Sequence, residues 1–213
     1  MNERRQSKFD SVVRSRQRDL TVILENIVDP HNIGAVMRSC DAVGVREIFL
    51  LYTESGIAGK MIKMGKKSSA GARKWLEIYY YQDLDACFEH VRTAGYTRVL
   101  STHLIEGQSK SLYDLDLTQP TALLFGNERL GISVEALARS DGNFVIPMLG
   151  MVESLNISVA CAVSLFEASR QRRLAGFYDD QLQLSDIEQA ALMEHYQERS
   201  KQRIEIRQVF LKK

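Results

Sequence analysis

The sequence predicts an α/β fold in which a parallel sheet is covered by helices on both faces. Short runs rich in apolar and β-branched residues alternate with longer segments of helical character, and Gly or Pro separates many of them. The apolar runs are nearly continuous, as expected of strands that are buried on both faces. Of the 213 residues, 45% are hydrophobic and 26% are charged, which excludes a disordered or collagen-like chain.

Six strands and four helices follow one another along the central part of the chain. The strands are predicted near residues 21–25, 47–52, 76–81, 98–103, 121–125 and 143–147. The helices are predicted at 31–43, 84–93, 133–139 and 156–173. Asp29 and Pro30 form the start signal of the first helix, and Gly44 its stop. Residues 56–71, rich in Gly, Ser and Lys, are predicted to form a loop.

Both ends of the chain are predicted to add charged helices to this domain. One covers roughly the first 18 residues, and the other runs from about 185 to 210. The second helix has so few large apolar residues that it must pack on the domain or on another chain. The predicted organisation is therefore an N-terminal extension (1–19), a central domain (20–175) and a C-terminal extension (176–213).

The net charge of +1 conceals a strong segregation of charge along the chain. Residues 1–18, 60–74 and 199–213 hold 18 of the 28 basic residues and only 3 of the 27 acidic ones. The rest of the chain has 10 basic and 24 acidic residues, a net charge of −14. Charged ends and loops can be no more than solvated, but three segments with so few acids favour binding to a phosphate backbone.

Several classes of protein lose support. No apolar run approaches the ~20 residues that span a bilayer, and the polar N-terminus is no secretory signal. The three cysteines are far apart and form no CxxC pair, which predicts a cytoplasmic protein with buried thiols. The four histidines lack metal-ligand spacing, and neither GxGxxG nor GxSxG occurs.

Three loops that follow predicted strands carry unusual polar residues. They are residues 25–38, 125–133 and 146–158. In a parallel sheet, ligands bind beyond the carboxyl ends of the strands, where such loops meet. Taken singly, each loop is equally well a turn or a helix cap, because Asp29, Ser133 and Asn156 are all good caps. Together they indicate one site, in which Gly34 leaves room for a ligand beside Arg38 on the same helix face.

These three loops resemble the signature motifs of the SpoU (TrmH-like) 2′-O-ribose RNA methyltransferases, a branch of the knotted SPOUT superfamily, over roughly residues 20–173. The charged extensions resemble those of the members that methylate the guanosine at position 18 in the tRNA D-loop. The resemblance implies a homodimer without a metal or membrane, a tRNA substrate, and S-adenosylmethionine bound in a deep C-terminal trefoil knot.

The resemblance also assigns residues by their positions in the motifs. It implies catalytic roles for Asn32, Arg38, Glu128, Ser154 and Asn156. It places S-adenosylmethionine against Thr102, Gly126, Ile146 and Leu155. We expect RNA to bind the basic segments, through Arg4, Arg5, Lys8, Arg14, Lys60, Lys63, Lys66, Lys67, Arg203 and Arg207.

The reaction needs a group that accepts the proton of the ribose 2′-hydroxyl. The family assigns this step to the motif 1 arginine, here Arg38, with a substrate phosphate. Because a guanidinium stays protonated to a pKa of roughly 12 or higher, Arg38 is better suited to clamp the phosphate while Glu128 or the phosphate takes the proton. Ser154 is either a positioner or only a helix cap. The alternatives are the same chemistry at another tRNA position or on ribosomal RNA, and a catalytically silent RNA-binding module.

Overall fold

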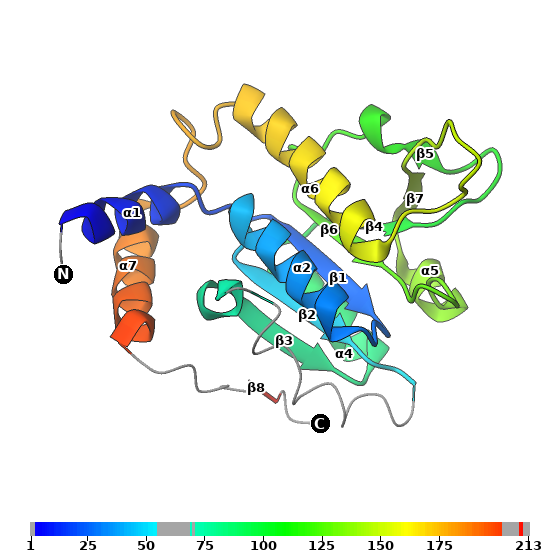
Figure 1. Ribbon diagram of the computed structural model, residues 1–213, viewed down its shortest axis with the longest axis horizontal. Coiled ribbons are helices and arrows are strands. Elements are labelled where there is room, and N and C mark those ends of the chain that lie inside the picture. The colour runs from blue at the N-terminus through cyan, green and yellow to red at the C-terminus, as the bar shows by residue number, and fades with distance from the viewer. Residues whose placement is uncertain (1–2, 55–68, 70, 202–208, 211–213) are drawn as a thin grey trace.

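A computed structural model describes residues 3–54, 69, 71–201 and 209–210, and Figure 1 shows their arrangement. The helices are α1 (Glu3–Arg14), α2 (Pro30–Ala42), α4 (Leu84–Thr93), α5 (Val134–Arg139), α6 (Ile157–Leu174) and α7 (Asp186–Lys201), with 3-10 turns η1 (Ala72–Trp75) and η2 (Leu112–Asp114). The strands are β1 (Leu20–Glu25), β2 (Glu47–Leu51), β3 (Glu77–Tyr81), β4 (Arg98–Thr102), β5 (Lys110–Ser111), β6 (Thr121–Phe125), β7 (Gly142–Val145) and β8 (Val209–Phe210).

The strands form one sheet in the order β5-β7-β4-β6-β1-β2-β3-β8, and every pair is parallel. At its centre, Ile23 of β1 lies opposite Phe49 of β2 and Leu124 of β6. All residues of β1 and β6 are buried, in agreement with their continuous apolar sequence. The predicted α/β class with a parallel sheet is confirmed.

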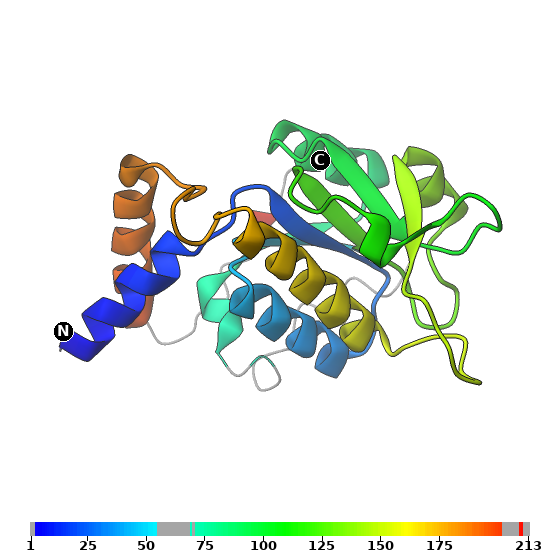
Figure 2. The ribbon, with the colours of Figure 1, turned by 90° about the horizontal axis from the view of Figure 1, so that it is seen from above.

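Helices cover both faces of the sheet. Figure 2 shows α2 and α6 side by side along one face, with α4 on the opposite face. The buried side chains divide accordingly into two cores. The first contains Ile33, Met37 and Cys40 of α2 with Cys161 and Leu165 of α6. The second core contains Cys87, Phe88 and Val91 of α4, and Ala136 of α5.

The helices α1 and α7 pack together beside the sheet, and we call this pair the arm (Figure 1). Phe9 and Val13 of α1 and Tyr196 of α7 form its buried core, and the ring of Trp75 packs at 5.7 Å from Phe9 and 5.4 Å from Tyr196. The helix α7, which has few large apolar residues, therefore packs on α1 and η1 of its own chain.

The prediction of a helix from 185 to 210 was wrong at its C-terminal end. The helix α7 ends at Lys201, and Val209–Phe210 pair with β3 as strand β8. The outer edge of β3 offers unpaired backbone groups, and an added strand satisfies them. The segments β5, η1 and η2 were not predicted either, because two to four residues are too few for a periodic signal.

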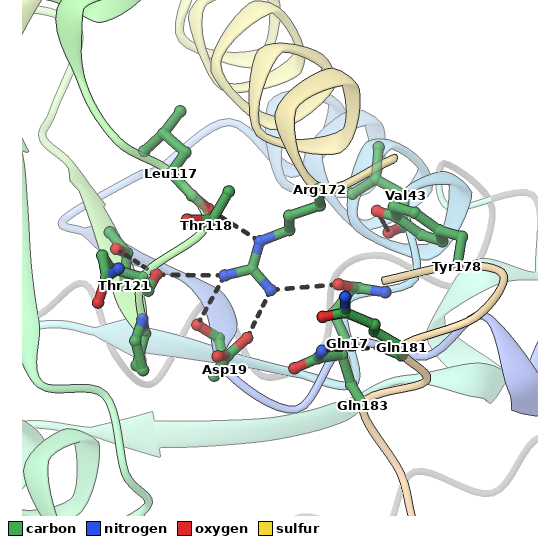
Figure 3. Close-up of polar contacts among 12 residues, drawn as sticks. Gln17, Asp19, Val43, Leu117, Thr118, Thr121, Arg172, Tyr178, Gln181 and Gln183 are labelled. Carbon is green, nitrogen blue, oxygen red and sulfur yellow. Dashed lines mark hydrogen bonds and ion pairs between the residues drawn. The ribbon is translucent and has the colours of Figure 1, made fainter. Parts of the chain in front are cut away.

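A buried arginine fixes the junction between the domain and its ends. Arg172, in the last turn of α6, is 0% exposed, and Figure 3 shows its guanidinium among its hydrogen-bond acceptors. It donates to the Asp19 carboxylate at 2.5 Å and to Gln17 Oε1 at 3.2 Å. It also donates to the carbonyl oxygens of Leu117 (2.9 Å) and Gln119 (3.2 Å). The start of β1 and the segment before β6 are thereby tied to α6.

Candidate functional site

A cavity of about 470 Å³ lies at the carboxyl ends of β4, β6 and β7. This edge of the sheet is where the sequence predicts a ligand site. The cavity volume lies within the range of roughly 300–1,000 Å³ typical of ligand pockets. Its walls come from the segments after β4 and β6 and from the long connection between β7 and α6.

The four residues predicted to bind the cofactor, Thr102, Gly126, Ile146 and Leu155, all line this cavity. Apolar walls are contributed by Leu104, Phe125, Phe144, Met148, Ile157 and Ala160, and polar groups by Asn127, Glu128, Glu153, Ser154 and Asn156. Such a mixed lining matches the chemistry of S-adenosylmethionine, which combines the apolar faces of an adenine ring with a positively charged sulfonium and a charged amino-acid end. The residues present therefore fit this cofactor.

Hydrogen bonds bring residues of the three loops together at the cavity. The amide of Asn32, in the first turn of α2, donates to Glu128 Oε1 at 2.6 Å. Asn156, the N-cap of α6, donates from its amide to Asn32 Oδ1 at 3.1 Å. Its own Oδ1 accepts from the backbone N–H of Ser158 at 2.9 Å, as a capping residue does. The row Asn156–Asn32–Glu128 thus joins loops that are far apart in sequence.

The turn that carries Glu128 is tightly closed between two glycines. Asn127 and Gly131 exchange backbone hydrogen bonds of 2.9 and 2.8 Å. A Cβ on Gly126 would lie 2.3 Å from the carbonyl carbon of Gly131, and Gly131 itself has φ +71°. Any larger residue at Gly126 would force this turn open, so the two glycines fix its shape.

Arg38 is not brought to this cavity by its own chain. It is exposed on α2 and lines a separate hollow of about 540 Å³ with Ser69, Trp75 and Phe166. Gly34 is buried, so it does not leave an open space beside Arg38 as the spacing suggested. Ser154 is exposed and lines the cavity, while the N-cap of α6 is Asn156.

The basic residues of the first segment lie on the arm. Arg4, Arg5, Lys8 and Arg14 are all exposed on α1. Arg16 is different, because it is fully buried and donates to the carbonyl of Val45 at 2.8 Å and to the Asp41 carboxylate at 2.6 Å. The predicted RNA-binding residues Lys60, Lys63, Lys66, Lys67, Arg203 and Arg207 lie outside the described residues.

The cysteines are confirmed as buried free thiols. Burial raises the pKa of Cys87 to about 12, and it raises that of Cys161 well above its ordinary value, with a further contribution from neighbouring Cys40. A thiol reacts as its thiolate, so these groups are unsuited to nucleophilic chemistry. Within residues 3–54, 69, 71–201 and 209–210, no group of three His, Cys, Asp or Glu is placed to hold a metal ion. No described helix is long and apolar enough to cross a bilayer.

Sequence reasoning missed several residues of the site. Asn127 lies in the predicted loop 125–133 and is assigned no role from the sequence, although its side chain organises the turn described above. His103 and Met148 line the cavity without any sequence signal of their own. For Asn127 a signal existed, because an Asn between Gly126 and Glu128 at the end of a buried strand is a side chain able to cap a turn.

Comparison with known proteins gives a consistent result. Residues 19–166 match the model of the SpoU rRNA Methylase family. The chain is 46% identical over 177 residues to the tRNA (guanosine(18)-2'-O)-methyltransferase of Thermus thermophilus, covering 83% of this chain and 88% of the relative. It is 37% identical over 194 residues to the Escherichia coli K12 enzyme of the same name, covering 91% and 82% of the two chains.

Solved structures resemble this fold as well. The crystal structure of a TrmH/SpoU tRNA modifying enzyme from A. aeolicus superposes with a TM-score of 0.82 at 33% identity, covering 94% of this chain and 98% of that one. The SpoU methyltransferase AviRb from Streptomyces viridochromogenes, in complex with the cofactor AdoMet, gives a TM-score of 0.63 at 31% identity, covering 74% of this chain and 59% of that one.

Proposed function

The chain belongs to the SpoU rRNA Methylase family, and from that premise we propose that it transfers a methyl group from S-adenosylmethionine to the ribose 2′-hydroxyl of the guanosine at position 18 of tRNA. The Thermus thermophilus and Escherichia coli relatives, which are named for this activity, align with most of the chain. The observation that carries the proposal is the hydrogen-bonded row Asn156–Asn32–Glu128 at the edge of a cavity that fits the cofactor.

Thr102, Gly126, Ile146 and Leu155 would hold the cofactor, each from the wall of the cavity. When bound, S-adenosylmethionine supplies an activated methyl group and a neutral thioether as leaving group. The protein must then hold the ribose hydroxyl in line with that methyl group and assist the loss of its proton. The apolar walls of the cavity exclude water that would compete for the same position.

Glu128 would receive the hydroxyl proton, directly or through water. Its carboxylate reaches the cavity and is fixed by the amide of Asn32, whose other side is held by Asn156. Asn32 and Asn156 carry no titratable group, so their role is to orient the carboxylate and the ribose. Ser154 adds a hydroxyl to the same wall and positions substrate there rather than capping α6.

Arg38 would act from a second copy of the chain. Its own chain holds it away from the cavity, on a surface that also exposes Phe166. Val159, Phe166 and Leu174 are exposed at spacings of 7 and 8 along α6, so they share one helix face, and Leu149, Met151 and Val152 are exposed in the loop before it. Burial of this apolar surface in a homodimer would bring Arg38 of one protomer toward the cavity of its partner. There its guanidinium would clamp the substrate phosphate and stabilise the developing alkoxide.

We propose that extensions 1–19 and 176–213 flank a domain at 20–175, and the family match over residues 19–166 supports this division. We place tRNA on the exposed basic face of the arm and on the basic segments at 60–67 and 203–207.

A deep knot is supported by the sheet order, since the late strand β7 is inserted between β5 and β4 and leads directly into the cofactor loop. The buried free cysteines and the tRNA substrate agree with a cytoplasmic location.

The deciding experiment is transfer of a labelled methyl group from S-adenosylmethionine to unmodified tRNA, followed by mapping of the modified nucleotide. We expect label only on the 2′-oxygen of the guanosine at position 18. Label at another tRNA position, or only in ribosomal RNA, would replace the substrate assignment. Absence of transfer to either RNA, with RNA binding intact, would identify the chain as a silent RNA-binding module.

A further inference from the structure

Asn26, the first residue after β1, has an unusual backbone conformation. Its φ is +54°, the only positive value at a non-glycine position in the part of the chain that the structure describes. The residue is also buried, with 5% of its surface exposed. Asn tolerates the left-handed region better than most residues, yet such a conformation persists only where the surroundings hold it.

The side chain and N–H of Asn26 form hydrogen bonds with residues at the end of β2 and just after it. Its N–H donates to the carbonyl of Leu51 at 2.8 Å. Its Oδ1 accepts from the backbone N–H groups of Thr53 (3.0 Å) and Glu54 (3.4 Å), and its Nδ2 donates to Thr53 Oγ1 at 3.0 Å. These bonds hold the left-handed conformation in place.

The carbonyl of Asn26 is used on the other side, toward the cofactor cavity. It accepts a 2.7 Å hydrogen bond from the side-chain amide of Asn127. The Oδ1 of Asn127 in turn accepts from the N–H groups of Arg129 (2.8 Å) and Leu130 (3.1 Å). Asn127 is therefore both the internal support of the turn that carries Glu128 and its attachment to β1.

The far end of the same turn is attached to the neighbouring residue. The carboxylate of Glu25, which is 0% exposed, accepts from the N–H of Ser133 at 2.9 Å and from its hydroxyl at 2.5 Å. Two consecutive residues at the end of β1 thus fix both ends of the turn between residues 126 and 133. With both ends fixed, the position of Glu128 depends on where the Asn26 carbonyl points.

We infer that Asn26 is a positioning residue for methyl transfer. Its left-handed backbone directs the carbonyl at Asn127, and this sets Glu128 against Asn32 and Gly126 against the cofactor. That the positioned step is methyl transfer rests on the proposed function. The role of Asn26 in placing the cavity wall does not depend on that function. The side chain serves only to hold this backbone conformation. Glycine, which adopts the same φ without a side chain, should therefore replace Asn26.

Two substitutions separate the backbone from the side chain. Asn26→Gly removes the side chain but allows the left-handed φ, so the carbonyl can still meet Asn127. Asn26→Ala removes the same contacts and disfavours that φ, so the carbonyl turns away. For Asn26→Ala we expect weaker S-adenosylmethionine binding by calorimetry and a saturated single-turnover rate lower by about 10²-fold, as for a misplacement of about 1 Å. The tRNA affinity should be unchanged, and Asn26→Gly should stay close to wild type in all three.

The attachment is tested separately by Asn127→Ala. It should lose at least as much as Asn26→Ala, because it also removes the acceptor of the Arg129 and Leu130 N–H groups. The double variant should lose no more than Asn127→Ala alone, because both substitutions break the bond between Asn127 and the Asn26 carbonyl. Rates are measured below the unfolding temperature of each variant, with Asn26→Asp as the conservative control that keeps the Oδ1 acceptor. Equal losses in Asn26→Gly and Asn26→Ala, or additive losses in the double variant, would overturn the inference. If wild type methylates no tRNA, the proposed function fails, while the cofactor affinities still decide the role of Asn26.

Discussion

The amide of Asn32 donates a 2.6 Å hydrogen bond to the carboxylate of Glu128, across 96 residues of sequence. The bond joins the start of α2 to the turn after β6, so it forms only when the sheet places β1 beside β6. The bond engages Glu128 Oε1, so Oε2 is the oxygen that is left to accept a proton. Because the bond already holds the carboxylate in one orientation, the side chain need not be ordered again before it accepts a proton.

Glu128→Gln tests the carboxylate itself. The substitution keeps the size of the side chain and an oxygen for Asn32, but it removes the charge and the capacity to accept a proton. We expect the single-turnover rate to fall by about 10²-fold or more, as for loss of a general base, with S-adenosylmethionine affinity largely kept. An unchanged rate would transfer the role of acceptor to the substrate phosphate.

Arg38→Ala tests the proposed clamp. Loss of a donor that stabilises a developing oxyanion lowers turnover by about 10²–10³-fold, whereas the loss of one phosphate contact among many changes tRNA affinity little. We therefore expect a large fall in single-turnover rate and a small one in tRNA binding, with Arg38→Lys restoring part of the rate. If turnover and affinity fell by the same factor, Arg38 would be an ordinary backbone contact.

The exposed basic face of α1 is tested by changing Arg4, Arg5, Lys8 and Arg14 together to Gln. Deleting residues 1–18 is a poorer test, because it also removes buried Arg16 and the core residues Phe9 and Val13. We expect weaker tRNA binding and a salt dependence of log Kd that is shallower by up to about 3, at 0.7–0.9 per phosphate contact. Cofactor affinity should not change, and Arg139→Gln, an exposed arginine on α5, serves as the control. An unchanged salt dependence would exclude the arm from the tRNA interface.

Arg172→Met tests the buried junction between α6 and the start of β1. It leaves the Asp19 carboxylate and the carbonyls of Leu117 and Gln119 without their donor. We expect a loss of about 3 kcal/mol in the free energy of unfolding, the lower end of the range for breaking a buried ion pair. Urea unfolding monitored by circular dichroism measures it, and the surface substitution Arg139→Gln should leave the midpoint unchanged. A midpoint equal to wild type would contradict the role of Arg172.

The start of α7 predicts a pH dependence of stability. Glu188 accepts hydrogen bonds from the hydroxyl (2.7 Å) and N–H (2.9 Å) of Ser185, and it pairs with Arg18. The Ser185 bonds and then Arg18 lower the pKa of Glu188 to about 2. Because the folded pKa lies below the unfolded value, the stabilisation is complete above about pH 5 and is lost as the pH falls toward 2. The difference in unfolding midpoint between wild type and Glu188→Gln should therefore be largest near pH 7 and shrink at pH 3. A constant difference would contradict this.

The buried strands and the helix caps could be predicted from the sequence, because each depends on residues that are close together in the chain. The buried strands β1 and β6 read as apolar runs, and Asp29, Ser133 and Asn156 were found as caps because a cap needs only its own helix. The end of α7 and the pairing of β8 were missed, since they depend on a distant edge strand. The site motifs were predicted to converge, but the separation of Arg38 from the cavity depends on which face of α2 packs inside, and a spacing of four residues does not decide that.

The core of the arm has a consequence for how the protein is made. Phe9 and Val13 are synthesised before the sheet and its helices, whereas their partner Tyr196 is synthesised after them. At roughly 5–20 residues per second, α1 waits at least several seconds with its apolar face uncovered while the sheet and its helices assemble. The arm is thus completed only after the sheet and its helices have been synthesised, and a product truncated before α7 would lack the buried partner of Phe9 and Val13.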